Sequence, residues 1–173
     1  MSELRFAYPL RPIIAWKLMD VRWDDGVLGS CMAPTMVTFP RQVWKPVCQT
    51  GSHSAPGWDC ECGVNASNQL ITLIEIAHEY LDAHVPRRVA VCYAIVKLGM
   101  WGRVIVDDVG TYRAQYAYPQ HIFLCVREPR DLIWAATARR VQWRYNVTTS
   151  VEDLYDKHIF DDIQAAIDAG GGV

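Results

Sequence analysis

Four candidate metal ligands lie within fifteen consecutive positions in the first half of this 173-residue chain. They are Cys48, His53, Cys60 and Cys62, in the spacing C-x4-H-x6-C-x-C. Three thiolates and one imidazole are the ligand set of a closed tetrahedral zinc site, and the loops between them are short enough to wrap one ion. Structural zinc leaves no coordination position for water or substrate, so this set predicts one structural zinc ion per chain.

The same residues also have a simpler interpretation, in which the cysteines are small buried hydrophobic residues and His53 is a surface residue. The segment favours metal, because it is rich in glycine, serine and proline and has little core of its own. Gly63, directly after Cys62, fits a metal knuckle, in which the backbone turns tightly around a thiolate. The C-x-C spacing is less usual than C-x2-C, so a three-ligand site and a Cys48–Cys60 disulfide remain open.

The two remaining cysteine environments differ from that of the loop. Cys31 is a conceivable substitute ligand, whereas Cys92 and Cys125 lie in apolar runs and are expected to be core thiols.

No arrangement of residues predicts catalysis. Ser54, His53 and Asp59 are close in sequence but lack a nucleophile turn, and His53 is better used as a ligand. The paired carboxylates of the chain occupy turns or an acidic helix, where adjacent side chains point apart. The chain also has no glycine-rich phosphate loop, so no catalytic residue is assigned and an enzyme of unknown reaction is the least favoured class.

A second candidate site is a ligand or nucleic-acid surface formed by Trp101, Arg103 and Arg113. Aromatic and arginine side chains close together across a hairpin could stack bases and contact phosphates. Aromatic residues are spread through the whole chain, however, so an ordinary core hairpin is the simpler interpretation. A small basic helix face formed by Arg130, Arg140 and Arg144 is best explained as a solvated face.

Composition predicts a soluble globular protein that is most simply one domain, residues 1–173. Residues 1–126 would form a strand-rich core with a metal loop at 44–66, and residues 127–173 the C-terminal helices. The net charge of −2 argues against general duplex DNA binding without a local basic patch. With no signal sequence and no long apolar run, we expect a cytoplasmic protein with no membrane contact, where reduced thiols favour metal over disulfide.

The pattern along the chain predicts α+β: a curved antiparallel sheet or partial β-barrel with an inserted helix, the zinc-stabilised loop and two C-terminal helices. Branched and aromatic residues over 13–23, then Asp24-Asp25-Gly26 and residues 27–31, indicate a β-hairpin. A helix is expected over 69–83, capped by Ser67 or Asn68. Further strands are expected at 89–98, 103–106, 112–118 and 121–126, with Gly99 and Gly102 marking a bend or bulge between the first two.

One side-chain arrangement and two further helices are also expected. Strict alternation places Tyr112, Tyr116 and Tyr118 on the interior of the sheet and Arg113 in solvent. Pro129 is expected to open a helix that ends near Arg144. A last, acidic helix is expected over 151–169, capped by Ser150 with Asp153 three residues later.

Several motifs together resemble a known set of sequences. They are HSAP at 53–56, CECGVNA at 60–66, WGRV at 101–104 and YRAQYAYP at 112–119. Over about residues 10 to 125 the chain resembles a family of uncharacterised proteins of actinobacteria and their phages, with the motifs HxAP, CxCG, WGRV and YRAxYAYP. In that family a cysteine, the HxAP histidine and the CxCG pair occur together, so the resemblance implies that the four candidate ligands act as one unit.

The chain departs from this family at Asn65, where a tyrosine or histidine is common, and throughout its C-terminal third. The resemblance implies no activity. Two functions are therefore expected in order of preference: a zinc-stabilised phage or actinobacterial accessory protein that binds a protein partner, in the host cytoplasm if phage-encoded, and a small-barrel module that binds RNA or single-stranded DNA. The sequence does not assign an oligomeric state.

Overall fold

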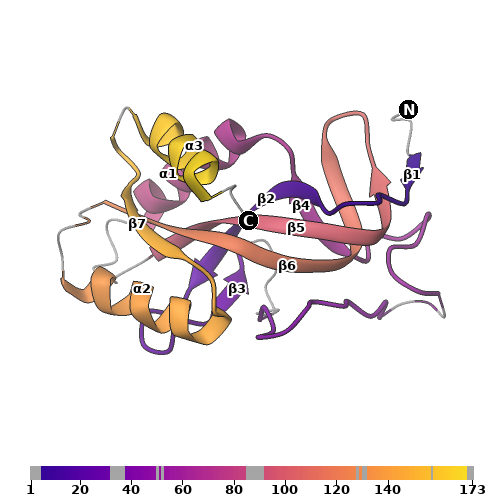
Figure 1. The fold of residues 1–173 in the computed structure, drawn as a ribbon, viewed down its shortest axis with the longest axis horizontal. Coiled ribbons are helices and arrows are strands. Elements are labelled where there is room, and N and C mark those ends of the chain that lie inside the picture. Colours follow the sequence, from indigo (N-terminus) through magenta and orange to yellow (C-terminus); the bar gives the residue numbers. More distant parts are fainter. Residues whose placement is uncertain are drawn as a thin grey trace. The chain divides into compact units, whose positions relative to one another are not determined.

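The computed structural model describes residues 5–31, 38–49, 51, 53–84, 92–127, 129, 132–156 and 158–170 (Figure 1). Its contacts divide the chain into two compact units that interleave along the sequence. Unit 1 comprises residues 1–17, 40–69 and 97–120, and unit 2 comprises residues 18–39, 70–96 and 121–173. The organisation as one domain stays a prediction.

The strands confirm the expected fold class. In the pairing order β1-β5-β2-β4-β6-β7, strands β5 and β6 also pair with each other, so β5, β2, β4 and β6 form a closed circuit of neighbours. The strands β2 (Ile13–Val21), β5 (Cys92–Val106) and β6 (Thr111–Val126) are the longest, and each has residues in both units. The chain is thus α+β, with a partial barrel, one inserted helix and two C-terminal helices.

Unit 1 is built on the hairpin formed by β5 and β6. Asp107 shapes its turn, because the carboxylate accepts hydrogen bonds from the backbone N–H groups of Val109 (3.2 Å) and Thr111 (2.6 Å). Strand β1 (Arg5–Ala7) adds to β5 in antiparallel register, with Arg5 opposite Val106. Strand β4 (Val64–Ser67) adds to β6 in the same sense, with Val64 opposite Ala114.

Unit 2 contains the hairpin of β2 with β3 (Leu28–Ser30), as the sequence indicated. It also holds α1 (Leu70–His84), α2 (Leu132–Tyr145), β7 (Thr149–Asp153) and α3 (Ile159–Gly170). Helix α1 begins as expected, since the Ser67 hydroxyl accepts a hydrogen bond from the N–H of Gln69 at 3.0 Å. Helices α1 and α3 contact each other, and α2 contacts β7 (Figure 1).

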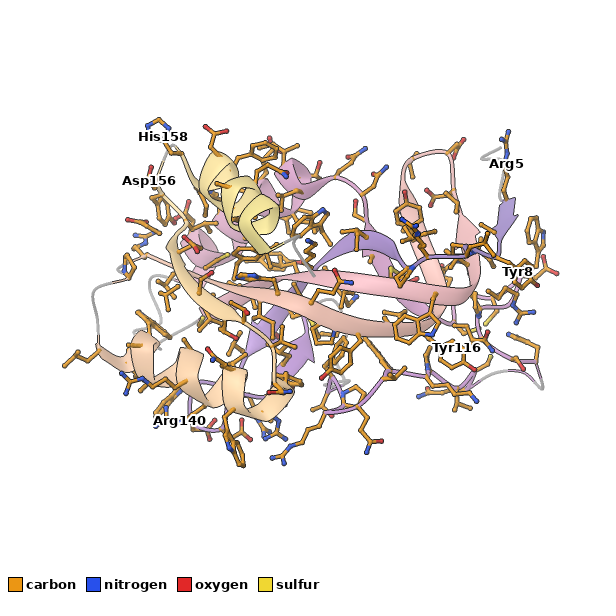
Figure 2. The ribbon with its side chains drawn as sticks, in the orientation of Figure 1. Arg5, Tyr8, Tyr116, Arg140, Asp156 and His158 are labelled. Carbon is orange, nitrogen blue, oxygen red and sulfur yellow. The ribbon has the colours of Figure 1, made fainter. Side chains whose placement is uncertain are left out.

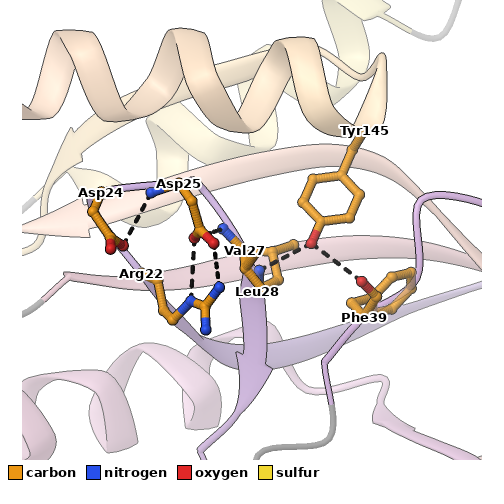
Figure 3. A network of polar contacts seen from close by, with 7 residues as sticks. All are labelled: Arg22, Asp24, Asp25, Val27, Leu28, Phe39 and Tyr145. Atoms are coloured by element: carbon orange, nitrogen blue, oxygen red, sulfur yellow. Dashed lines mark hydrogen bonds and ion pairs between the residues drawn. The ribbon is translucent and has the colours of Figure 1, made fainter.

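Tyr145, at the end of α2, ties the hairpin to the helices of unit 2 (Figure 3). Its fully buried hydroxyl accepts a hydrogen bond from Leu28 N–H at 2.9 Å and donates to the carbonyl of Phe39 at 3.3 Å. In the adjacent turn, the Arg22 guanidinium hydrogen-bonds to Asp25 and lowers the pKa of that carboxyl group. Gly26 has φ +68, and a Cβ there would lie 2.9 Å from the backbone nitrogen of Val141, so only glycine fits this turn.

Two expected breaks between strands were wrong. Residues 92–106 form one strand and residues 111–126 another, so neither residues 99–102 nor residues 119–120 interrupt a strand. Gly102, with φ +77, is the irregular position within β5. The part of the first expected strand at 89–91 lies outside the described residues.

The expected last helix over 151–169 was also wrong in its first half. Residues 149–153 form β7, which pairs in parallel with β6, Ile122 opposite Thr149. Asp153 accepts from the N–H of Tyr155 (3.0 Å) instead of capping a helix, and Asp156 accepts from that of His158 (2.8 Å) at the start of α3. The predicted cap of Ser150 with Asp153 was therefore wrong, and Asp156 is the residue that accepts at the start of α3.

The expected alternation in β6 does not hold. Tyr112, Tyr116 and Tyr118 are half-buried rather than interior, and the buried side chains nearby are Ala114 and Ala117. The change from even to odd buried positions between these two alanines shows that the strand does not alternate regularly there. Arg113 is half-buried instead of facing solvent.

Among the described residues, no helix has both the length and the apolar character needed to cross a membrane.

Candidate metal centre

The structure brings the four expected ligands together in unit 1. One ligand atom from each of Cys48, His53, Cys60 and Cys62 lies within 4.8 Å of all the others. The Sγ atoms of Cys48 and Cys60 are 3.5 Å apart, and His53 Nε2 is 3.2 Å from Cys62 Sγ. Tetrahedral zinc with bonds of about 2.3 Å to sulfur places its ligand atoms about 3.8 Å apart, so these separations need only small adjustments around an ion.

The thiols are reduced. All six cysteines are free, and the Cys48–Cys60 separation is far longer than the S–S bond of about 2.05 Å in a disulfide. The alternative of a Cys48–Cys60 disulfide is therefore not what the structure holds. Cys31 is not in the cluster, and Cys92 and Cys125 are buried core thiols as expected.

Strand β6 anchors the ligand loop at both ends. Before Cys48, Trp44 and Ala117 exchange two backbone hydrogen bonds of 2.8 and 3.1 Å. After Cys62, β4 begins at Val64 and pairs with Ala114. The fifteen positions from Cys48 to Cys62 thus leave and rejoin the same strand, which keeps the two ends of the loop close without a large loop core.

Two glycines leave room for the histidine. A Cβ on Gly57 would lie 2.2 Å from His53 Nε2, and one on Gly51 would lie 2.7 Å from its Nδ1. The N–H of Gly57 also donates to Cys62 Sγ at 3.2 Å. Such N–H···S bonds orient thiolates and offset their charge, which is the support that metal ligands usually have.

Two arginines support the loop from the hairpin below it. Arg103 on β5 donates to the carbonyl of Ser54, and Arg113 on β6 donates to the carbonyls of Cys60 and Gly57. Three thiolates around a divalent ion would leave one net negative charge, which these guanidinium groups oppose. In the metal-free chain, burial raises the pKa of the Cys62 thiol, so metal binding must release a proton there.

These contacts change the interpretation of the expected nucleic-acid surface. Arg103 and Arg113 are directed to loop carbonyls, and Trp101 stacks on Tyr116 with ring centroids 5.9 Å apart. Lys45 lies over Tyr116, with its Nζ 5.7 Å from the ring centroid, and Figure 2 labels Tyr116. The sequence indicated that these residues gather, but not that the two arginines support the metal loop.

The sequence indicated only indirectly that these two arginines support the ligand loop. Arg103 and Arg113 lie opposite the loop because β5 and β6 form one long hairpin. The sequence predicted four shorter strands over these residues. The sequence around Gly57 indicated only a segment rich in loop-forming residues.

Comparisons of the chain with protein-family models, with curated proteins and with solved structures found no match.

Proposed function

We propose that this protein binds one zinc ion through Cys48, His53, Cys60 and Cys62, and that the zinc is structural. The observation that carries the proposal is the convergence of three thiols and one imidazole within 4.8 Å. Thiolate-rich sites with one histidine suit zinc better than the oxygen-seeking Mg²⁺ or Ca²⁺. Four protein ligands fill a tetrahedral ion, so no position is left for a reacting water molecule.

We further propose that the zinc-ordered loop is a binding surface for a protein partner. Val47 is 82% exposed and directly precedes the ligand Cys48, and Trp58 is 43% exposed and directly follows Gly57. A bound ion would hold the backbone of both residues in place, and rigid aromatic and aliphatic side chains are the usual anchors of protein interfaces. The resemblance in the sequence supports an accessory protein of an actinobacterium or its phage, acting in the cytoplasm.

The experiment is affinity capture from an actinobacterial lysate treated with nuclease, using zinc-loaded and chelator-treated protein. We expect a captured protein that is lost both on chelation and in a Val47→Ser, Trp58→Ser double variant. Val109→Ser is the matched control, because Val109 is an exposed valine in the 107–110 turn, outside the ligand loop. Capture that survives chelation and the double variant would contradict the proposed surface.

Nucleic acid at the Trp101 hairpin is the weaker candidate, since the two guanidinium groups that would contact phosphate there are directed to loop carbonyls. If captured material disappears with nuclease instead of with chelation, this order of preference reverses.

A further inference from the structure

Helix α2 is a local basic element in an acidic protein. Its sequence, LIWAATARRVQWRY, contains Arg139, Arg140 and Arg144 and no acidic residue, whereas the whole chain has a net charge of −2. Arg140 extends from α2 and is exposed (Figure 2). Local concentration of positive charge, rather than total charge, determines where a protein attracts phosphate.

One face of this helix also presents a large aromatic ring. Trp143 is 78% exposed, and it lines a broad hollow of about 600 Å³ together with Arg139, Gln142 and Asn146. Gln142 and Trp143 lie three and four residues after Arg139, so these three share one side of α2, and Asn146 directly follows the end of the helix. Leaving so much indole surface in water forgoes the stabilisation that burial of an aromatic side chain normally provides.

The charged groups around this face leave it positive. Arg140 donates to the carbonyl of Trp23 at 3.1 Å and keeps its charge. In the neighbouring turn, Asp25 is paired with Arg22, and Asp24 accepts a hydrogen bond from the N–H of Asp25. Both carboxylates of this turn thus interact with Arg22, which offsets part of their negative charge.

We propose that this face of α2 binds single-stranded nucleic acid. A base stacks on the Trp143 indole, while Arg139 contacts a flanking phosphate. Arg140, whose guanidinium also donates to the Trp23 carbonyl, adds positive charge nearby. Stacking requires an unpaired base, which excludes the interior of a duplex, and side-chain amides such as those of Gln142 and Asn146 can hydrogen-bond to base edges. An acidic peptide would satisfy the arginines but would give the indole no planar partner.

This inference does not rest on the protein-binding function proposed above. It uses only residues of unit 2, whereas the metal loop lies in unit 1. Loss of zinc binding and loss of nucleic-acid binding can therefore be measured separately.

The first test measures binding of a fluorescent twelve-nucleotide oligouridylate by anisotropy, at low salt and with zinc-loaded protein. Trp143→Ala should weaken binding about tenfold, in line with the effect of removing one stacked base. The matched control is Tyr8→Ala, a change at an exposed aromatic residue of unit 1, and this variant should bind like the original protein. Equal weakening by both variants, or by neither, overturns the proposal.

A second probe separates stacking from charge. An abasic oligomer of the same length carries the same phosphates without bases, so it should bind about tenfold more weakly than oligouridylate. Equal affinity for the abasic oligomer, or for polyglutamate at matched charge, would mean that α2 recognises negative charge alone and overturns the stacking site.

Salt dependence tests the arginines. Arg139→Gln should reduce the slope of log K against log salt by about 0.7, the value for one phosphate contact on a single strand. Arg5→Gln changes an exposed arginine of β1 and should leave the slope unchanged.

If Trp143→Ala instead converts a dimer into a monomer in light scattering, the face contacts a second copy and the proposal is wrong.

Discussion

At Gly57, one hydrogen atom in place of a side chain decides where the His53 imidazole can lie. A Cβ at this position would be 2.2 Å from His53 Nε2, which is far inside van der Waals contact. The imidazole could avoid a methyl group by rotating, but it would then leave its place beside Cys62. The geometry of one ligand therefore depends on a residue that does not touch the metal.

Gly57→Ala is expected to lower zinc affinity at least about tenfold, because displacing a ligand should cost no less than the loss of a supporting contact. Competition with a chromogenic chelator measures the zinc affinity. Gly29→Ala is the control, since among the residues that the structure describes a Cβ on Gly29 meets nothing closer than Asp20 Cβ at 4.0 Å. Unchanged affinity in the Gly57 variant would mean that His53 is not a ligand.

Thiol alkylation should separate the cysteines into two groups. At pH 8, removal of metal should expose Cys48, Cys60 and Cys62 to iodoacetamide, because bound zinc otherwise occupies the reactive sulfur atoms. Cys92 and Cys125 should stay unmodified in folded protein with or without metal. Burial raises the pKa of both thiols, that of Cys125 to about 12, and the thiolate is the reactive form.

Mass spectrometry of the alkylated peptides gives the result, with half-exposed Cys31 as the internal reference. Modification of Cys125 at the rate of Cys31 in folded protein would contradict the buried core that the structure describes.

The ligands could be predicted from sequence because their chemistry is local: four metal-binding side chains in one short loop have few other uses. The roles of Arg103 and Arg113 could not be predicted from the sequence. Their contacts with Ser54 and Cys60 span about fifty positions and depend on how β5 and β6 pair, which no local sequence pattern encodes.

At the scale of elements, Tyr145 joins the end of α2 to the β2–β3 hairpin and to Phe39. Tyr145→Phe removes the hydroxyl and leaves the buried N–H of Leu28 without its acceptor. We expect a loss of about 1–3 kcal/mol in the free energy of unfolding, the usual cost of a buried donor left unsatisfied. Urea denaturation measures this loss.

Tyr155→Phe provides the comparison for this substitution. The Tyr155 hydroxyl bonds to Asp82 at 2.5 Å, but its side chain is 41% exposed and water can replace the contact. A change within about 0.5 kcal/mol is expected for this variant. Equal losses of unfolding free energy in the two variants would show that the buried Tyr145 hydroxyl contributes no more stability than the exposed Tyr155 hydroxyl.

Helix α3 is expected to stabilise its own unit rather than to serve as a free arm. Ile159 and Ile163 are buried, and α3 contacts α1. Ending the chain after Asp156 keeps β7 and removes both isoleucines, so about 3–6 kcal/mol of apolar burial is lost and the melting temperature should fall.

Calorimetry and light scattering distinguish this outcome from a role in association. If the shortened protein keeps its melting temperature and loses only self-association, α3 is a binding element and its packing within unit 2 is unimportant.

The position of α3 shows why element boundaries were partly unpredictable. Ser150 and Asp153 have the spacing of a helix start, and the residues after them have helical periodicity. Yet residues 149–153 pair with β6, because a neighbouring strand offers their backbone hydrogen bonds that no local pattern encodes. The strong local signals, the Asp25-Gly26 turn and the Ser67 cap, were followed as expected.

For the molecule as a whole, the metal takes the place of a core that the loop lacks. Between Cys48 and Cys62, the described residues that are buried are Cys48 and three small residues, Ala55, Pro56 and Gly57. So little apolar burial cannot offset the entropy of ordering fifteen positions, whereas zinc binding contributes directly to folding. The protein is therefore expected to bind one zinc ion per chain.

That claim is tested most directly by elemental analysis of protein purified without chelators, alongside Cys62→Ser and Cys31→Ser variants. We expect close to one zinc per chain in the original protein and in the Cys31 variant, and loss of zinc with a lower melting temperature in the Cys62 variant. Protein without zinc, or a Cys62 variant that retains the ion and its melting temperature, would contradict it.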